Sequence, residues 1–480
     1  MKIWVINPPF KEKTTREGRC AQKKSIWSSL WPLMSLAYIA AVLRKDGHEV
    51  RAFDCVASEI DKDAFFRKAE SNGAPRLAVI NTSTPTIESD LEFVRDLKKE
   101  FPQTTTVVFG THPSVLTNEC LDSGADIAVI GEPENSIRII SRSMENGSEE
   151  GLDQANFARK NPDGSISVFS GNAFSDHLDE MPFPAWDLFD LSKYLMPGKD
   201  LAPKKFLTVT PSRGCPHSCS FCNAGSYYGK KPRFRDPDYV VDEIERNIRE
   251  FGIKDFLIWT ESFTMDPEFA EKICDEIIKR GLKTNWVCNS RTDAASFPLF
   301  KKMKEAGCWM ISFGVESGDQ SILDGAHKGA SVADAEEAIS LAKKAGLLTV
   351  SHVIVGLPGE TKESVERTWG LLSRAKPDFA QFYCAVPFPG SKLYEDAIRN
   401  NWIKQGGAFA DFEQMRSVMD LPTMKAEETM KLKNRLYLRY YLNIPRAFQL
   451  IRRASVKGII SAGKSVAVLI FSEIKGQFKP

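Results

Sequence analysis

Three cysteines near the middle of the 480-residue chain are the residues best suited to chemistry. Cys215, Cys219 and Cys222 follow C-x3-C-x2-C spacing, directly after Leu207–Thr210, an apolar run typical of a strand. Three thiolates on one short loop can hold three irons of a [4Fe–4S] cluster, which usually takes four cysteines. The fourth iron then stays open to an exogenous ligand, so the spacing predicts a catalytic cluster.

Other interpretations of these cysteines stay open. A zinc site needs four ligands, and His217 is the only nearby fourth candidate, although it lies awkwardly between Cys215 and Cys219. A simple electron carrier is a further alternative, against which the three-cysteine motif argues. The cysteines that lie in apolar helix or strand patterns are predicted to be buried and inert: Cys274, Cys288, Cys308 and Cys384.

Strand and helix patterns alternate around the cysteine loop. Helical segments such as Tyr239–Phe251 and Val332–Ala345 separate six apolar runs between residues 206 and 400. The predicted strands are Leu207–Thr210, Asp255–Thr260, Thr284–Cys288, Met310–Val315, Leu348–Val355 and Phe379–Val386. Six βα units over residues 204–400 predict a full or partial (β/α)6 barrel.

The cysteine motif, its position after the first strand of this block and the following Asn223–Arg235 stretch resemble the radical S-adenosylmethionine (SAM) superfamily. The resemblance implies that Cys215, Cys219 and Cys222 bind the cluster and that its open iron chelates the amino and carboxylate groups of SAM. It also implies one-electron cleavage of SAM to a 5′-deoxyadenosyl radical.

Four further positions match the SAM-binding positions of that family at the ends of successive strands. Glu261 is expected at the SAM amino nitrogen, and Arg291 at its carboxylate through a two-pronged contact. Glu316 is expected to accept from the ribose hydroxyls, and Gly356 lies in the turn expected beside the adenine.

The first 145 residues predict a doubly wound, flavodoxin- or Rossmann-like domain. Short apolar runs at Ile3–Ile6, Leu77–Asn81, Thr106–Phe109 and Ile127–Ile130 are separated by helix-length segments, which favours a parallel sheet. Ligands of such sheets bind at the carboxyl ends of the strands. The residues expected to line that rim are Asn7, Pro8, Thr82, Ser83, Thr84, Gly110, Thr111, His112 and Glu132.

Together with the barrel, this domain resembles the cobalamin-dependent branch of the radical SAM superfamily, through segments such as Asn7-Pro8-Pro9, Leu36–Leu43 and Gly131-Glu132. The resemblance implies bound cobalamin at the rim. That branch generally lacks the lower histidine ligand of cobalt, and here His48 is predicted to be a turn residue, while His112 is a candidate for approaching the corrin. A flavodoxin-like domain with another ligand, or none, stays an alternative.

A methylthiotransferase is the family most easily confused with this branch. Such enzymes carry extra cluster cysteines in the N-terminal domain. Cys20, Cys55 and Cys120 are too dispersed to look like that set.

Charge and composition set limits on partners. Lys and Arg number 64 against 63 Asp and Glu, so the overall charge gives no support to nucleic-acid binding. The N-terminus lacks the features of a signal peptide and no apolar run is long enough to span a bilayer, so a cytoplasmic location is expected.

The remaining segments are a predicted connector over residues 146–203, rich in turn formers, and a mainly helical C-terminal region over residues 401–480. From Lys431 to Pro480 there are eleven Lys or Arg and one acid, mixed with aromatic residues up to about Arg453. This tail favours either a helical cap over the barrel with a solvated basic face or peripheral contact with a membrane surface.

The resemblance leads to three functional hypotheses. The favoured one is a methyltransferase that uses the cluster, SAM and cobalamin to methylate an unactivated carbon or phosphorus of a small-molecule or lipid substrate, with electrons from a flavodoxin or ferredoxin. An oxidative cyclase with the same cofactors is the alternative enzyme. A non-catalytic protein that binds the cluster or cobalamin is the third.

Overall fold

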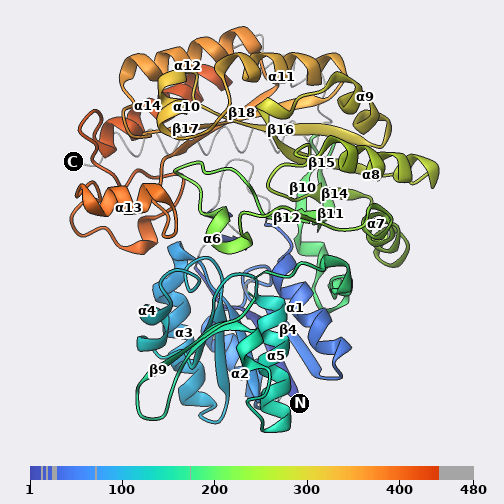
Figure 1. Ribbon diagram of the computed structural model, residues 1–480, viewed down its shortest axis with the longest axis vertical. Helices are drawn as coiled ribbons and strands as arrows, with labels where there is room; N and C mark the ends of the chain where they lie inside the picture. The colour runs from blue at the N-terminus through green and yellow to red at the C-terminus, as the bar shows by residue number, and fades with distance from the viewer. Residues whose placement is uncertain (12–13, 18–19, 24–29, 71–72, 173, 443–480) are drawn as a thin grey trace.

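The computed structural model describes residues 1–11, 14–17, 20–23, 30–70, 73–172 and 174–442. The chain forms an N-terminal α/β domain and a second α/β domain that lie against each other, as Figure 1 shows in blue and in green to orange. This arrangement confirms the predicted fold class. The basic tail beyond residue 442, and with it the choice between a cap and a membrane contact, lies outside the described residues.

The first domain is built on a seven-stranded sheet of order β4-β1-β5-β6-β7-β8-β9, whose first five strands are parallel. Strand β5 is buried at every position, which is why it reads as an unbroken apolar run in the sequence. The strands are β1 (Lys2–Asn7), β4 (Glu49–Asp54), β5 (Leu77–Asn81), β6 (Thr105–Phe109), β7 (Ile127–Val129), β8 (Asn156–Lys160) and β9 (Ile166–Ser170), and a small hairpin pairs β2 (Thr14–Glu17) with β3 (Cys20–Lys23). The helices are α1 (Met34–Lys45), α2 (Lys62–Glu70), α3 (Ile87–Glu100), α4 (Thr117–Asp122) and α5 (Pro133–Asn146).

One part of the predicted connector differs from the structure. Strands β8 and β9 lie within residues 146–203, and they extend the first sheet as an antiparallel hairpin beside β7. The outer strand β9 is only partly buried and carries Ser at two of its five positions, so it has no apolar run that would mark it as a strand.

The second domain is an open, curled sheet of order β10-β11-β14-β15-β16-β17-β18, which is the predicted partial barrel. Its strands are β10 (Leu195–Pro197), β11 (Pro203–Val209), β14 (Asp255–Ile258), β15 (Asn285–Arg291), β16 (Cys308–Glu316), β17 (Leu348–Val355) and β18 (Phe379–Cys384), and a short pair joins β12 (Ser212–Arg213) to β13 (Arg233–Phe234). The helices are α6 (Ala224–Tyr228), α7 (Pro237–Phe251), α8 (Pro267–Lys279), α9 (Phe297–Glu305), α10 (Gln320–Gly325), α11 (Val332–Lys344), α12 (Lys362–Ala375) and α13 (Lys392–Arg399). In Figure 1, α8, α9, α11 and α12 cover the side of the sheet that faces away from the first domain.

Helix α14 (Ala426–Tyr441) protects the edge of the second sheet. The hydroxyl of Tyr437 accepts a hydrogen bond from the backbone N–H of Phe382, and that of Tyr441 accepts one from Ala380. Both N–H groups belong to β18, the last strand, whose outer edge would otherwise be left unpaired. None of the described helices is long and apolar enough to cross a membrane.

Candidate functional site

The cysteine loop is held at both ends by backbone geometry. It begins after β12, which pairs antiparallel with β13, and the N–H of Cys215 donates to the carbonyl of Gly229 at 3.1 Å. Gly214 has a φ of +90°, and a Cβ there would lie 2.2 Å from the carbonyl oxygen of Lys231. Only glycine fits this close approach, so the residue before the first cysteine sets the path of the loop.

The three thiols of the loop line one cavity of about 870 Å³ inside the curled sheet. All three cysteines are partly buried and in the free thiol form. Burial raises the pKa of Cys219, although Lys328 and Arg291 oppose that shift. Arg291 donates to the Cys219 sulfur at 3.7 Å.

The donor set fits a cluster better than a single metal ion. Among the described residues, no three His, Cys, Asp or Glu side chains are grouped closely enough to hold one ion. A tetrahedral zinc site requires such a group, so the zinc alternative gains no support. In a cubane cluster each thiolate binds its own iron, which three separate thiols on one loop satisfy. The assignment of Cys215, Cys219 and Cys222 as ligands stays a prediction.

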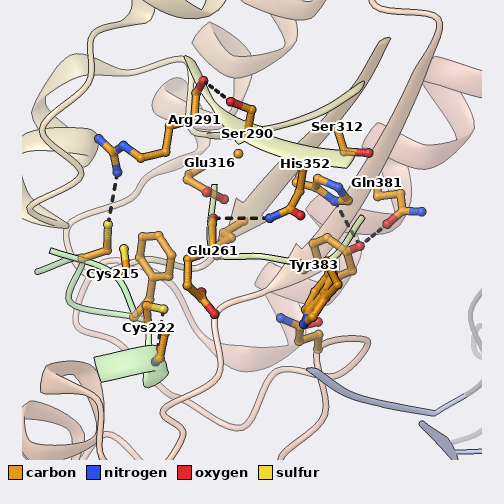
Figure 2. Close-up of a pocket in the computed structure, with 18 of the residues that line it drawn as sticks. Cys215, Cys222, Glu261, Ser290, Arg291, Ser312, Glu316, His352, Gln381 and Tyr383 are labelled. Atoms are coloured by element: carbon orange, nitrogen blue, oxygen red, sulfur yellow. Dashed lines mark hydrogen bonds between the residues drawn. The ribbon is translucent and has the colours of Figure 1, made fainter. Parts of the chain in front are cut away.

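Strand alternation builds the rest of the cavity. Side chains at every second position of β14 to β18 face inward, so three candidate SAM-binding residues, Glu261, Arg291 and Glu316, line the same cavity as the cysteines (Figure 2). Glu261 follows β14 and is buried. Arg291 ends β15, where it pairs with Asp293 at 2.7 Å and donates to the carbonyl of Lys328 at 2.6 Å.

Glu316 is held in a strained position beside a lysine that the sequence pattern did not mark. Its φ of +61° is uncommon for a residue with a side chain, and such strain often occurs at functional sites. Its carboxylate pairs with the Lys328 ammonium at 2.7 Å, and both side chains are buried. Lys328 lies in the loop after α10, outside any strand-end motif, so no sequence signal distinguished it.

Gly356 does not line the cavity. Its φ is +91°, its N–H donates to the Glu360 carboxyl group, and a Cβ would lie 2.7 Å from a methyl group of Thr429 on α14. Burial raises the pKa of Glu360 to about 8. Packing against α14 is therefore sufficient reason for a glycine here, and its contact with adenine stays a prediction.

Polar inward-facing residues deeper in the curled sheet form a part of the cavity that sequence reasoning missed. Their spacing could have identified them, because inward-facing side chains recur at every second position of a strand. Three of them lie two or four positions before a candidate SAM-binding residue, and the other two lie two positions apart on the neighbouring strand β18. They are Asn289, Ser312, His352, Gln381 and Tyr383.

The rim residues of the first domain lie at the carboxyl ends of the strands, as the parallel sheet requires, but they are covered. The hairpin β2–β3 brings Arg16 over the rim, where it pairs with Asp90 at 2.8 Å and donates to Asn7 at 2.7 Å. The predicted rim residues Asn7, Pro8, Thr82, Ser83, Thr84, Gly110, Thr111, His112 and Glu132 are all buried. Their assignment as cobalamin contacts stays a prediction.

His112 is the rim residue with the most distinctive surroundings. Its Nδ1 atom is 3.3 Å from the Thr84 hydroxyl, its ring packs edge-on against Phe409, and its Nε2 atom has no hydrogen-bond partner among the described residues. Burial lowers the pKa of His112 to about 4, so the imidazole is neutral at neutral pH. A buried neutral ring nitrogen of this kind can accept a hydrogen bond or ligate a metal.

The other N-terminal candidates contribute little. His48 lies in the turn between α1 and β4, as predicted. Cys55 and Cys120 are buried, and burial raises the pKa of both thiols. For Cys20 the structure describes the backbone in β3 but not the side chain.

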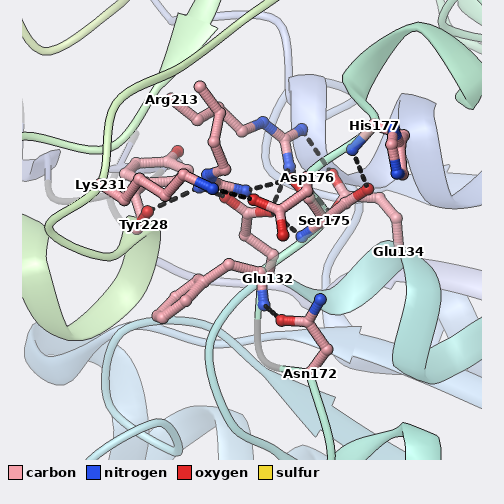
Figure 3. Close-up of polar contacts among 11 residues, drawn as sticks. Glu132, Glu134, Asn172, Ser175, Asp176, His177, Arg213, Tyr228 and Lys231 are labelled. Carbon is pink, nitrogen blue, oxygen red and sulfur yellow. Dashed lines mark hydrogen bonds and ion pairs between the residues drawn. The ribbon is translucent and has the colours of Figure 1, made fainter.

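Glu132 belongs to a buried ionic cluster between the two domains (Figure 3). Its carboxylate accepts from both terminal nitrogens of Arg233 and lies 3.4 Å from Arg213. Glu134, in the first turn of α5, pairs with Arg213 at 2.7 Å. Burial disfavours the charge of Arg213, but Glu134 and Glu132 outweigh it and raise the pKa of the guanidinium well above its usual value. The cluster ties the first domain to the residue that precedes Gly214 and Cys215.

Apolar contacts join the domains beside this cluster. Helix α1 is buried from Met34 to Leu43, and its Tyr38 donates to Glu243 of α7 at 3.2 Å. Trp31 packs edge-on against Trp259 of the second domain, with ring centroids 4.8 Å apart, and both line the cavity. The cavity therefore reaches the domain junction.

Comparison with known protein families identifies both domains. A model of the radical SAM superfamily matches residues 209–372, and a model of the B12 binding domain matches residues 28–141. The first match contains the cysteine loop and the candidate SAM-binding residues, and the second contains most of the predicted rim.

Several curated proteins are similar over most of the chain. An uncharacterized methyltransferase of Pyrococcus horikoshii is 29% identical, over 92% of this chain and 93% of that protein. An anaerobic magnesium-protoporphyrin IX monomethyl ester cyclase of Rubrivivax gelatinosus is 28% identical, over 86% of this chain and 74% of the relative.

Solved structures support the fold. The radical S-adenosylmethionine methyltransferase TsrM from Kitasatospora setae, solved with cobalamin and a [4Fe-4S] cluster, superposes with a TM-score of 0.67 at 15% identity, over 91% of this chain and 81% of that one. The cobalamin-dependent S-adenosylmethionine radical enzyme OxsB superposes with a TM-score of 0.75 at 13% identity, over 96% and 71%.

Proposed function

Because the chain joins a B12-binding domain to a radical SAM domain, it is a cobalamin-dependent radical SAM enzyme of the methyltransferase and cyclase type, and we propose that it methylates an unactivated carbon or phosphorus. The relative that is similar along almost its full length is named a methyltransferase, which supports this choice. The observation that carries the proposal is the cavity, which is lined both by the three cysteines of the second domain and by Trp31 of the first.

Each cofactor supplies one part of the chemistry: when bound, the cluster and SAM provide one-electron cleavage to a carbon radical, and cobalamin provides a methyl carrier. The role proposed for Cys215, Cys219 and Cys222 is to hold the cluster at the wall of the cavity. Glu261 and Arg291 offer a carboxylate and a guanidinium at the carboxyl ends of the adjacent strands β14 and β15, which matches the amino and carboxylate groups of SAM.

The remaining residues position groups and limit water. The Glu316–Lys328 pair is fixed by burial, so its carboxylate needs little reorganisation to accept hydroxyl hydrogen bonds. Trp259, Trp309 and Trp31 line the cavity, and such apolar walls favour the controlled use of a reactive radical. A flavodoxin or ferredoxin is the proposed source of the electron.

A cyclase is the second candidate, since the Rubrivivax cyclase is similar over most of this chain. The two reactions differ in the fate of SAM. Methylation consumes a second SAM as methyl donor, so it yields S-adenosylhomocysteine together with 5′-deoxyadenosine, whereas hydrogen removal in a cyclisation needs no methyl donor.

The test uses anaerobically reconstituted protein with cobalamin, dithionite and SAM carrying a deuterated methyl group. Hydroxylated polycyclic lipids and tetrapyrroles are supplied as substrates, and products are analysed by mass spectrometry. We expect equal amounts of 5′-deoxyadenosine and S-adenosylhomocysteine, and transfer of the labelled methyl group. Product that has lost hydrogen without gaining label would contradict methylation and support the cyclase. Cys222→Ala is the inactive control, and Gln320→Met, on the exposed face of α10, is the active one.

A further inference from the structure

The turn that carries Glu261 lies beyond the paired part of its strand. The hydrogen-bonded ladder between β14 and β15 ends at Ile258 and Cys288. Glu261 follows three residues later, on the wall of the cavity (Figure 2). A side chain on a turn is held less precisely than one on a strand, so the position of this carboxylate depends on the contacts that hold the turn.

Asn289 provides those contacts where the ladder ends. It is the next residue of β15 after Cys288, and its Nδ2 atom donates to the carbonyl of Thr260 at 2.6 Å and to that of Glu261 at 3.3 Å. Its own carbonyl accepts a hydrogen bond from the N–H of Phe263 at 3.0 Å. One residue therefore binds the turn through both its side chain and its backbone.

The orientation of the Asn289 amide follows from these partners. A backbone carbonyl can only accept a hydrogen bond, so the group that faces the two carbonyls is the NH2 group, with one proton for each. The Oδ1 atom is buried and has no hydrogen-bond partner among the described residues. The amide therefore holds the turn by donation, and a side chain without an N–H group cannot replace it.

The same strand carries the second candidate SAM-binding residue. Arg291 lies two residues after Asn289, on the same face of β15, and its backbone N–H donates to the Ser262 hydroxyl of the turn at 3.2 Å. These contacts fix the turn against the end of β15, and with it the spacing between the Glu261 carboxylate and the Arg291 guanidinium. Because SAM carries its amino and carboxylate groups on one carbon atom, recognition of both depends on that spacing.

We propose that Asn289 is a positioning residue for SAM binding, whose amide holds the turn after β14 so that the Glu261 carboxylate meets the amino group of SAM. Asn289 acts through Glu261 and makes no contact with the reacting atoms. This inference rests on the proposed function, because it takes Glu261 as the contact of the SAM amino group. It adds the residue on which the position of that carboxylate depends.

The test measures SAM affinity by equilibrium dialysis of the reconstituted holoenzyme without reductant. Asn289→Leu keeps the approximate size of the side chain and removes both donors, so we expect about tenfold weaker binding. In reductive cleavage with dithionite, the KM for SAM should rise by a similar factor, while the rate at saturating SAM stays within about threefold of the parent rate. Asn400→Leu is the matched control with parent affinity, because Asn400 also donates to a backbone carbonyl, that of Asp396, but at an exposed helix end.

A double-mutant cycle shows whether Asn289 acts through Glu261. Glu261→Ala alone should weaken SAM binding about tenfold, because the contact with the amino group is lost. If Asn289 only places that carboxylate, adding Asn289→Leu to Glu261→Ala weakens binding by less than about threefold more. Two independent effects would instead multiply to about a hundredfold loss.

Iron content and circular dichroism are measured on each variant, and Asn289→Ala takes the place of Asn289→Leu if the leucine variant does not load the cluster. Parent affinity in the Asn289 variant, a lower saturating rate without a change in KM, or multiplied effects in the double variant would overturn the proposal. Unchanged affinity in Glu261→Ala would also overturn it, because Asn289 would then position no contact with SAM. A parent enzyme that binds and cleaves SAM with the expected variant effects but transfers no methyl group contradicts the proposed function alone.

Discussion

Glu132→Gln removes one charge from the ionic cluster that joins the two domains. In the parent protein the Glu132 carboxylate faces Arg233 and Arg213, and all three side chains are about 4% exposed. The substitution leaves the Arg233 charge buried, with the backbone carbonyls of Ser175 and Tyr228 as its remaining partners. A buried charge without a counter-charge is costly because water can no longer solvate it.

The expected loss of stability follows from that burial. Breaking a buried ion pair by removing one partner costs about 3–5 kcal/mol. Glutamine keeps one oxygen that can accept from the guanidinium, so we expect a loss of about 3 kcal/mol in the free energy of unfolding. With an m-value of about 3 kcal/mol per molar urea, the unfolding midpoint falls by about 1 M.

The assay is equilibrium urea unfolding followed by far-ultraviolet circular dichroism, on Glu132→Gln, Arg233→Gln and the double variant. Because the two side chains contact each other, the double variant should lose less stability than the sum of the single variants. Asp176→Asn is the control, since the Asp176–Lys231 pair lies at the same junction but is exposed, and its midpoint should not change measurably. A loss below about 1 kcal/mol for Glu132→Gln, or strict additivity, would refute the reasoning.

Two further substitutions test other parts of the structure. Gly314→Ala places a Cβ 2.5 Å from the Glu316 carboxylate and 2.9 Å from the Lys328 ammonium, so we expect at least a tenfold loss in the rate of 5′-deoxyadenosine release. Gly325→Ala is the control and should keep the parent rate, because the space around its Cβ is open. Equal rates for the two variants would contradict this role of Gly314. Burial raises the pKa of Glu360 to about 8 from 4.5, so the folded protein keeps a proton that the unfolded chain releases, and stability falls as pH rises between these values by up to about 1.4 kcal/mol per unit. Glu360→Gln removes this pH dependence of stability. Chemical denaturation at pH 5 and pH 8 should show that the free energy of unfolding of the variant increases relative to that of the parent as pH rises. The same difference between variant and parent at both pH values would contradict titration of a buried Glu360.

The parts of the fold that could be predicted from the sequence are those in which burial on both faces produces apolar runs. Strands β5 and β6 are predicted by such apolar runs. The apolar run of β11 likewise predicts the strand that the cysteine loop follows. The hairpin β8–β9 could not be found by the same signal, because its outer strand is half exposed.

The cavity illustrates a different limit. On β17, His352 points into the cavity while its apolar neighbours Val353 and Val355 pack outward beneath the helices. Polar alternation in a sequence is usually read as a solvent-facing side, so a polar cavity wall carries the same pattern as a surface. The pairing of Glu132 with Arg233, 101 positions apart, could not be predicted from the sequence either, because it depends on how the two domains pack against each other. The structure shows Glu132 between the domains, and its contact with a ligand stays a prediction.

The most direct test of the two-cofactor account is the composition of the reconstituted protein. The chain is incubated anaerobically with iron, sulfide and excess hydroxocobalamin, desalted, and assayed for iron, sulfide and corrin on one sample. The account predicts about four irons and one corrin per chain, with iron lost in Cys222→Ala and corrin retained there. Four irons without retained corrin would contradict the central claim and leave a radical SAM enzyme whose first domain binds something else.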